Sequence, residues 1–322
     1  MEHSPPSPPP PSRILKGVWA MRRRVLLLAV FCSLFLLSSA FGLEVTDDTG
    51  RTITLSSPAS RVVSLTPANT EIVFALGAEG SLVGVTTYCD YPEEAKKKEK
   101  IGSITEVDLE AIVRLDPDLV LAGSLTPPEV IERLTKLGYP VFVLDPKSIP
   151  QVIESIRKVA LLLGKEKEGE ALAQAMERNV QEVQARVSGL SEEEKPRVFH
   201  VIWHNPLWTA GKDTFIHEFI TLAGGKNVVE DLSGYVTLDL EELLRRNPDI
   251  ITVVSAHGEN LPYNFIVSDT RLKVLQAVQQ GRVFVVDSDI VSRPGPRITQ
   301  ALRIFASIIH PEIFGPYQSS KE

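Results

Sequence analysis

Cysteine is scarce in this 322-residue chain, which contains only Cys32 and Cys89. Catalytic signatures are missing as well: there is no Walker A loop, no G-x-S-x-G, no H-E-x-x-H and no C-x-x-C. No paired carboxylates with a nearby histidine stand out. These absences argue against nucleotide hydrolysis, serine-type hydrolysis, zinc proteolysis and thiol redox chemistry, and they predict a protein that is not an enzyme.

An excess of positive charge is also missing. The formal net charge is −7. Without residues 1–40, which hold five basic and one acidic residue, 29 basic and 40 acidic residues remain and the net charge is −11. A nucleic-acid-binding domain would show a basic stripe. We therefore expect no nucleic-acid partner.

The N-terminal part has the pattern of a secretory signal peptide. Three arginines at 22–24 precede an apolar run over 25–37, and small residues follow at 38–40. Residues 1–42 are therefore predicted to be a Pro-rich, disordered start plus a signal peptide. The remainder is predicted to be exported, to the periplasm or the outer face of the cytoplasmic membrane.

Several alternatives remain at this end of the chain. Met21 is a second candidate start, directly before the arginines, and the apolar run could instead stay as an uncleaved anchor. Cys32 could carry a lipid, although the residues before it are bulky. After export only Cys89 is left, so an internal disulfide is excluded.

An internal repeat sets the predicted fold. The stretch "DLEAIVRLDPDLV" at 108–120 matches "DLEELLRRNPDII" at 239–251 at six of thirteen positions. In both, an Asp caps a helix, a Pro follows its end and an apolar strand comes next. Each half alternates strands and helices, which predicts an α/β fold of two similar parallel-sheet lobes with a ligand cleft between them.

The domain boundaries follow from the repeat. We expect an N-terminal lobe over 43–147, linking helices over 148–195 and a C-terminal lobe over 196–322. Helical spacing of apolar residues breaks at Gly164 and resumes from about Glu166 to Val187. A long helix is thus predicted to join the lobes, and a helical linker should permit only modest opening.

Aromatic residues gather in the loops expected at the carboxyl ends of the strands, where α/β proteins bind ligands. Examples are "TTYCDYP" at 86–92 and "WHNPLWTAGKDT" at 203–214. The aromatic residues of these loops are Tyr88, Tyr91, Trp203, Trp208, Tyr235, Tyr263 and Phe265. Packing in the core is the alternative for each. Cys89 alternates with Tyr88 along the strand, so it should point away from the ligand.

No metal site is expected from the histidines. His200 and His204 lie in "RVFHVIWH", and on one strand face they would be about 13 Å apart, too far to share an ion. His204 and His257 remain weak candidates for contact with a ligand.

Four stretches carry a family resemblance: "RVVSLTPANTEIVFALG", "VGVTTYCDYP", "NPLWTAGKDTFIHEFITLAGGKN" and "SDIVSRPGPRI". They resemble the helix-linked periplasmic substrate-binding proteins of ABC importers for vitamin B12, iron–siderophores and haem. The likeness covers about 45–316 and is greatest to the cobalamin-binding members. Enzymes with related lobes, such as metal chelatases, would be cytoplasmic and would need metal-binding Cys or His, so the predicted signal peptide and the single remaining Cys89 argue against them.

The resemblance implies a monomer that captures a corrinoid and delivers it to an ABC permease in the inner membrane. It implies no resident cofactor, because the metal would belong to the ligand, a cobalt corrinoid or an iron chelate. Binding of an iron–siderophore or haem is the alternative. A ligand sensor on the same scaffold is the alternative outside transport.

Residue roles are carried over from the family motifs. Tyr88 would lie against the corrin ring, and Trp208 would occupy a second aromatic position. Arg293 would face the ligand with Asp289 beside it. The ligand-binding set is completed by Trp203, Tyr91 and Tyr235.

Two further roles and two departures also follow from the resemblance. Glu71 and Glu218, at equivalent positions in the two halves, would be surface glutamates that bind permease arginines. Cobalamin-binding members often carry tryptophan where this chain has Ile104 and Gly123, which leaves the exact ligand open.

Overall fold

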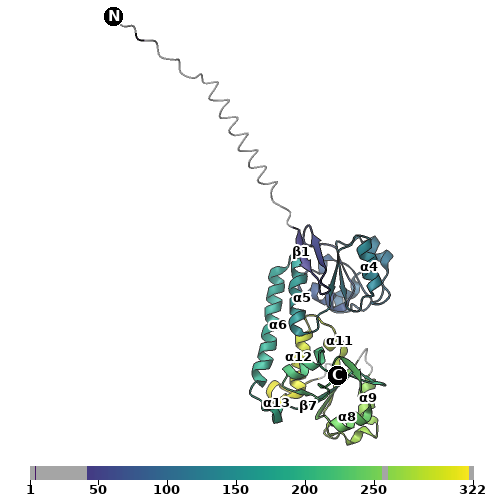
Figure 1. Cartoon of the computed structure of the whole chain (residues 1–322), viewed down its shortest axis with the longest axis vertical. Helices are drawn as coiled ribbons and strands as arrows, with labels where there is room; N and C mark the ends of the chain where they lie inside the picture. Colours follow the sequence, from purple (N-terminus) through teal and green to yellow (C-terminus); the bar gives the residue numbers. More distant parts are fainter. Residues whose placement is uncertain (1–3, 5–41, 256–259, 319–322) are drawn as a thin grey trace. The chain divides into compact units, whose positions relative to one another are not determined.

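The computed structural model describes residue 4 and residues 42–255 and 260–318. Contacts divide the chain into two units, Met1–Gly42 and Leu43–Glu322, and the second unit is described below (Figure 1). The predicted signal peptide, Cys32 and His257 lie outside the described residues. Within the described part, no helix is both long and apolar enough to cross a membrane.

The first lobe is built on a parallel sheet of order β4-β3-β5-β6. A hairpin of β1 and β2, with Gly50 at φ 84° in its turn, precedes it. The strands are β1 (Leu43–Thr46), β2 (Thr52–Leu55), β3 (Val62–Ser64), β4 (Leu82–Val85), β5 (Leu119–Gly123) and β6 (Val141–Leu144). The helices are α2 (Pro67–Ala75), α3 (Leu109–Leu115) and α4 (Pro128–Lys136).

The second lobe repeats this plan around a parallel sheet of order β10-β7-β12-β13. Its strands are β7 (Arg197–Val201), β10 (Lys226–Asn227), β12 (Ile250–Ser255) and β13 (Val283–Asp287). Its helices are α7 (Phe215–Leu222), α8 (Leu240–Arg246), α9 (Leu261–Ser268), α10 (Gln276–Gln279), α11 (Ser288–Ser292), α12 (Ile298–Ile309) and α13 (Pro311–Phe314). The predicted fold class, α/β with two similar parallel-sheet lobes, is confirmed.

The capping signals of the repeat are realised in both copies. The Asp108 carboxylate accepts a hydrogen bond from the Ala111 amide at 2.9 Å, and Asp239 accepts one from the Glu242 amide at 2.7 Å. Both helices end at a residue in the left-handed region, Asp116 at φ 43° and Asn247 at φ 38°. Local chemistry therefore fixes this helix–strand unit twice.

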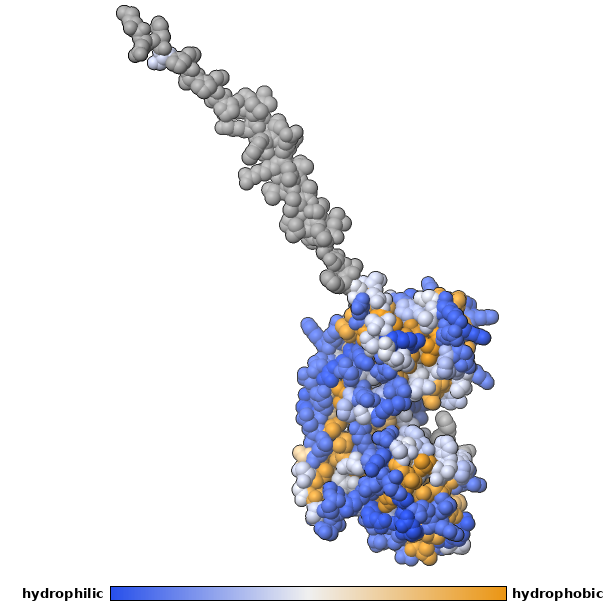
Figure 2. All heavy atoms as spheres, in the orientation of Figure 1, coloured by the Kyte–Doolittle hydropathy of each residue, from blue (hydrophilic) through white to orange (hydrophobic). Residues whose placement is uncertain are grey.

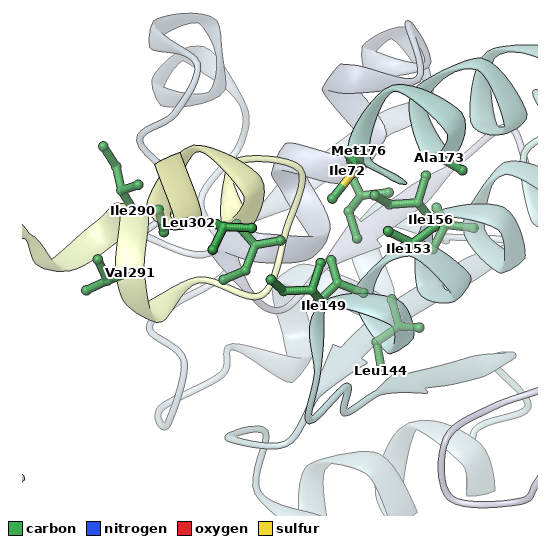
Figure 3. Packing of buried hydrophobic residues seen from close by; sticks show 14 of the residues in the cluster. Ile72, Leu144, Ile149, Ile153, Ile156, Ala173, Met176, Ile290, Val291 and Leu302 are labelled. Carbon is green, nitrogen blue, oxygen red and sulfur yellow. The ribbon is translucent and has the colours of Figure 1, made fainter. Parts of the chain in front are cut away.

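Two packed helices connect the lobes, α5 (Ile149–Leu162) and α6 (Glu166–Val187), with Gly164 between them at φ +65° (Figure 1). Only α6 runs past both lobes, and it packs against α12. One buried core continues from the first lobe through both helices into the second. Figure 3 shows Ile72, Ile153, Met176 and Leu302 within it. A wide hinge opening would have to break this core.

One difference between the halves concerns the predicted cleft loops. The loop predicted at 203–214 forms, together with the segment Tyr235–Thr237, a small antiparallel sheet of order β11-β9-β8. Its strands are β8 (Trp203–His204), β9 (Leu207–Ala210) and β11 (Tyr235–Thr237). The repeat could not reveal this sheet, because the first half has no counterpart to it.

Glu218 does not lie free at the surface. It stands in the first turn of α7, and its carboxylate accepts a hydrogen bond from the Ile149 amide, at the start of α5, at 2.8 Å. Burial raises the pKa of Glu218, and this hydrogen bond partly opposes the shift. The carboxylate of Glu218 is thus partly exposed and joins the second lobe to the linker, and its role in permease docking stays a prediction.

Replacement of Glu218 tests this joint. Glu218→Ala should lower the free energy of unfolding by about 1–2 kcal/mol, because the buried Ile149 amide loses its acceptor. Glu218→Gln keeps an acceptor oxygen and should stay within about 0.5 kcal/mol of the wild type. Urea unfolding of residues 43–322 measures both values, and equal stability of all three proteins would contradict the role.

Candidate functional site between the lobes

A cavity of about 240 Å³ lies between the two lobes. Its first wall comes from the carboxyl ends of β3, β5 and β6 and the start of α2, and its second from α11 and the residues after it. The lining residues are Thr66, Pro67, Ala68, Asn69, Ile72, Tyr88, Ile104, Gly123, Ser124, Leu125, Leu144, Pro146, Ser155, Asp289, Ser292, Arg293 and Pro294. In Figure 2 the surface recedes between the lobes on the side away from α6. Tyr88, Asp289 and Arg293, three of the predicted ligand-binding residues, thus share one cavity.

Close packing at the start of α2 holds the cavity wall in place. Thr66 caps the helix by accepting the Asn69 amide, and the buried Asn69 side chain donates to the Ala122 carbonyl at 2.9 Å. A Cβ on Gly123 would lie 2.7 Å from Cγ2 of Thr66, so a side chain there would force Thr66 to move. The positions where cobalamin-binding members often carry tryptophan, Ile104 and Gly123, both line the cavity.

Tyr88 and Cys89 point in opposite directions, for a reason other than the predicted one. Strand β4 ends at Val85, and the chain turns through a hydrogen bond from the Cys89 amide to the Thr86 carbonyl at 3.1 Å. Tyr88 is 50% exposed, whereas Cys89 is buried and its sulfur accepts a hydrogen bond from the Thr70 hydroxyl at 3.2 Å. Burial raises the pKa of the Cys89 thiol.

Five charged side chains meet where the lobes approach each other; we call them the interlobe ion cluster, namely Glu71, Asp90, Asp289, Arg293 and Arg297. Arg297 binds Glu71 through two nitrogens, Nε at 2.8 Å and Nη2 at 2.6 Å. Arg293 reaches Glu71 at 3.2 Å, Asp90 at 2.7 Å and Asp289 at 2.8 Å. Arg293 also lines the cavity, so the cluster adjoins the ligand space.

The cluster favours the charged form of Asp90. Partial burial alone would raise the pKa of Asp90, but the hydrogen bond and charge of Arg293 outweigh it, and the pKa is lowered. Burial would lower the pKa of Arg293, yet Asp90, Asp289 and Glu71 raise it. Ion pairing inside a partly desolvated interface thus dominates both groups.

Glu71 was predicted to lie at the surface, but only 3% of the residue is exposed. The prediction of an accessible docking carboxylate is wrong for this residue, since both of its oxygens bind arginines of the second lobe. Tyr91 is engaged too: the Arg297 guanidinium lies 4.0 Å from its ring centre, in a cation–π contact.

The remaining aromatic residues of the predicted ligand-binding set lie on the small sheet of the second lobe, whereas Tyr263 and Phe265 belong to α9. Trp203 pairs directly with Trp208, and Tyr235 pairs with Ala210, two residues further along the same strand. Directly paired residues and residues two apart share a face of a sheet, so the three rings lie on one side, which we call the aromatic face. They are 44%, 45% and 59% exposed, and none lines the cavity itself.

The histidines have different surroundings. His200 is buried, its Nδ1 lies 2.8 Å from the Thr252 hydroxyl, and burial lowers its pKa to about 3. His204 lies between Trp203 and Phe265, with ring centres 4.8 and 5.6 Å away. The two residues do not share one continuous strand, because β7 ends at Val201. Among the described residues, no group of three His, Cys, Asp or Glu is arranged to hold a metal ion.

The sequence did not reveal which residues of the ion cluster bind each other across the two lobes. Asp90 and Arg297 stand in the cleft loops, but their partners are about 200 residues away in the chain. The one local signal was the run "SRPGPR", in which two arginines four residues apart follow β13.

Known proteins resemble the chain over most of its length. The sequence model of the family described as "Periplasmic binding protein" matches residues 62–290. An uncharacterized ABC transporter substrate-binding lipoprotein, YvrC of Bacillus subtilis, is 32% identical over 282 residues, which cover 86% of this chain and 88% of that protein. A vitamin B12-binding protein of Salmonella choleraesuis is 34% identical over 247 residues, 76% of this chain and 88% of that protein.

A solved structure agrees with these sequences. The periplasmic heme-binding protein RhuT from Roseiflexus sp. RS-1 superposes with a TM-score of 0.70 and 28% identity, over 78% of this chain and 98% of that one. The two-lobed fold, the cavity between the lobes and these matches lead to one conclusion. The chain belongs to the periplasmic binding protein family, as a solute-binding protein of the kind that serves ABC importers and not as an enzyme.

Proposed function

We propose that the chain binds a corrinoid of the vitamin B12 type and delivers it to an ABC permease of the inner membrane. The observation that carries this proposal is the half-exposed ring of Tyr88 on the wall of an apolar cavity between the lobes. A flat macrocycle needs broad apolar and aromatic walls, and a tyrosine ring supplies such a surface with a polar tip.

The charges at the cavity favour a ligand with a neutral, amide-bearing rim. Arg293, which lines the cavity, already has three carboxylate partners. The side chains of two of these partners, Asp289 in the lining and Asp90 outside it, are each 39% exposed. These carboxylates can accept hydrogen bonds from amide groups. An anionic siderophore would instead need unpaired cations. The vitamin B12-binding relative supports the same choice.

The cavity is too small to hold a whole corrinoid, so part of the ligand would contact the second lobe. About 240 Å³ is less than typical pockets for drug-sized ligands provide, so a corrinoid would extend beyond it. The proposal therefore places the aromatic face of Trp203, Trp208 and Tyr235 on the opposite side of the ligand. Tyr91, whose ring is covered on one side by Arg297, would contribute only its free edge.

Haem is the second candidate. The Tyr88 hydroxyl lies at the cavity, and a tyrosine oxygen can bind haem iron. The similar structure from Roseiflexus is of a heme-binding protein.

Permease docking is not assigned to Glu71, since both of its carboxylate oxygens have partners inside the molecule, and it stays a prediction for Glu218. We propose that a monomer delivers the ligand.

Ligand titration tests the proposal directly. Residues 43–322 should bind cyanocobalamin, with quenching of tryptophan fluorescence and a measurable heat, because the aromatic rings would lie against the macrocycle. Haemin and a ferric siderophore serve as comparison ligands under the same conditions. Binding of haemin with a tyrosinate-to-iron absorption band, and none of cyanocobalamin, would replace the corrinoid by haem.

Substitution of the aromatic residues tests the site. Tyr88→Ala and Trp208→Ala should each weaken cyanocobalamin binding by about 1–3 kcal/mol, since each removes stacking area. Leu137→Ala is a matched control, because Leu137 is an exposed apolar residue at the end of α4 that lines no part of the cavity. Calorimetry measures the affinities, and an unchanged affinity of both aromatic variants would remove these residues from the site.

A further inference from the structure

Glu71 controls the cavity without lining it. Its carboxylate belongs to α2 of the first lobe, and 2% of its side chain is exposed. It accepts hydrogen bonds from Arg293 at 3.2 Å and from Arg297 at 2.8 and 2.6 Å. Arg293 lines the cavity, whereas neither Glu71 nor Arg297 does. Glu71 can therefore act on a ligand only through charge and through the position of Arg293.

The interlobe ion cluster has more acids than bases. Three carboxylates, Glu71, Asp90 and Asp289, face two guanidinium groups, so the cluster carries a formal charge of −1. Both guanidinium groups are mostly buried, at 12% and 16% side-chain exposure. Burial limits screening by salt, so the excess negative charge acts on the adjoining cavity.

Nearby lysines do not cancel this charge inside the cavity. The ammonium of Lys100 donates to the carbonyls of Cys89 and Ala95 at 3.2 Å each, and Lys100 does not line the cavity. Lys96 is exposed and pairs with Glu93 at 2.8 Å. Within the described lining, Arg293 and Asp289 are the charged side chains, and they bind each other.

We propose that Glu71 is a specificity-determining residue, whose buried charge makes the cavity reject ligands that carry a carboxylate beside Arg293 and accept those that carry an amide there. Without Glu71, Arg293 and Arg297 would balance Asp90 and Asp289, and an additional anion would meet no excess negative charge. This inference rests on the proposed ligand cavity and states which chemical class of corrinoid it selects.

Two matched probes isolate the charge of the ligand. The first is cyanocobalamin, and the second is its monocarboxylic acid, in which one peripheral amide has been hydrolysed. The two differ by one charge and almost nothing in shape. The measured quantity is the ratio of their dissociation constants at low salt, which we call the discrimination.

Two single variants change the charge of the cluster in opposite directions, and their combination leaves it unchanged. Glu71→Gln brings the cluster to zero and should lower the discrimination about three- to tenfold, the effect of one charge acting through a partly solvated site. Arg297→Gln brings it to −2 and should raise the discrimination by a similar factor. The double variant returns it to −1 and should restore the wild-type discrimination, although all three can differ from the wild type in thermal stability.

The double variant separates charge from structure. If Glu71 only holds Arg293 in place, both probes weaken by the same factor, the discrimination stays constant in all variants, and the proposal is overturned.

The same experiments distinguish failure of the proposed corrinoid function from failure of the role proposed for Glu71. If the wild type binds haemin and no corrinoid, the corrinoid proposal fails, and the same variants are compared with haemin and its dimethyl ester, which differ in carboxylate charge. If the ratio of the two dissociation constants changes with the charge of the cluster, the role of Glu71 is supported. If the ratio is the same in all variants, that role is overturned. If the wild type binds none of the four, both proposals fall.

Discussion

One buried carboxylate from the first lobe, that of Glu71, binds two guanidinium groups from the second, and the arrangement of the cleft depends on this contact. Burying charges is costly, and removal of one partner from such a group typically costs about 3–5 kcal/mol because the others remain uncompensated. The contact therefore favours one relative position of the lobes. The continuous core through α5 and α6 restrains the same movement from the opposite side. A ligand would enter a cleft whose walls are largely formed beforehand.

The same contact decides what Arg293 can offer a ligand. A guanidinium with three carboxylate partners has little remaining capacity to bind an anion, but it holds Asp289 at the cavity in a fixed orientation. The polar part of the cavity thus presents acceptors more than donors. Together with the ring of Tyr88 and the apolar lining, these acceptors are the features on which the proposal of a corrinoid ligand rests.

How far the sequence predicts this structure depends on the range of the interactions. The caps at Asp108 and Asp239, and the helix–strand units that follow them, were predictable because a helix end is decided by neighbouring residues. The loops at the cleft were also located, and with them Tyr88, Asp289 and Arg293. The sheet of β8, β9 and β11 was not predicted, because it has no copy in the first half. The burial of Glu71 was not predicted either, since its partner Arg293 lies 222 residues further along the chain.

The symmetry between Glu71 and Glu218 was informative, although it indicated a different role from the predicted one. The two residues stand at matching distances before Gly77 and Gly224, which both take a positive φ after their helices. Glu71 reaches from the first lobe to arginines of the second, and Glu218 reaches from the second lobe to the start of α5, which directly follows the first lobe. An equivalent acidic position in each half of the repeat thus joins the halves to each other. In the structure described here, the carboxylate of Glu71 is fully engaged with arginines of the second lobe, whereas that of Glu218 is partly exposed and accepts one amide through one oxygen.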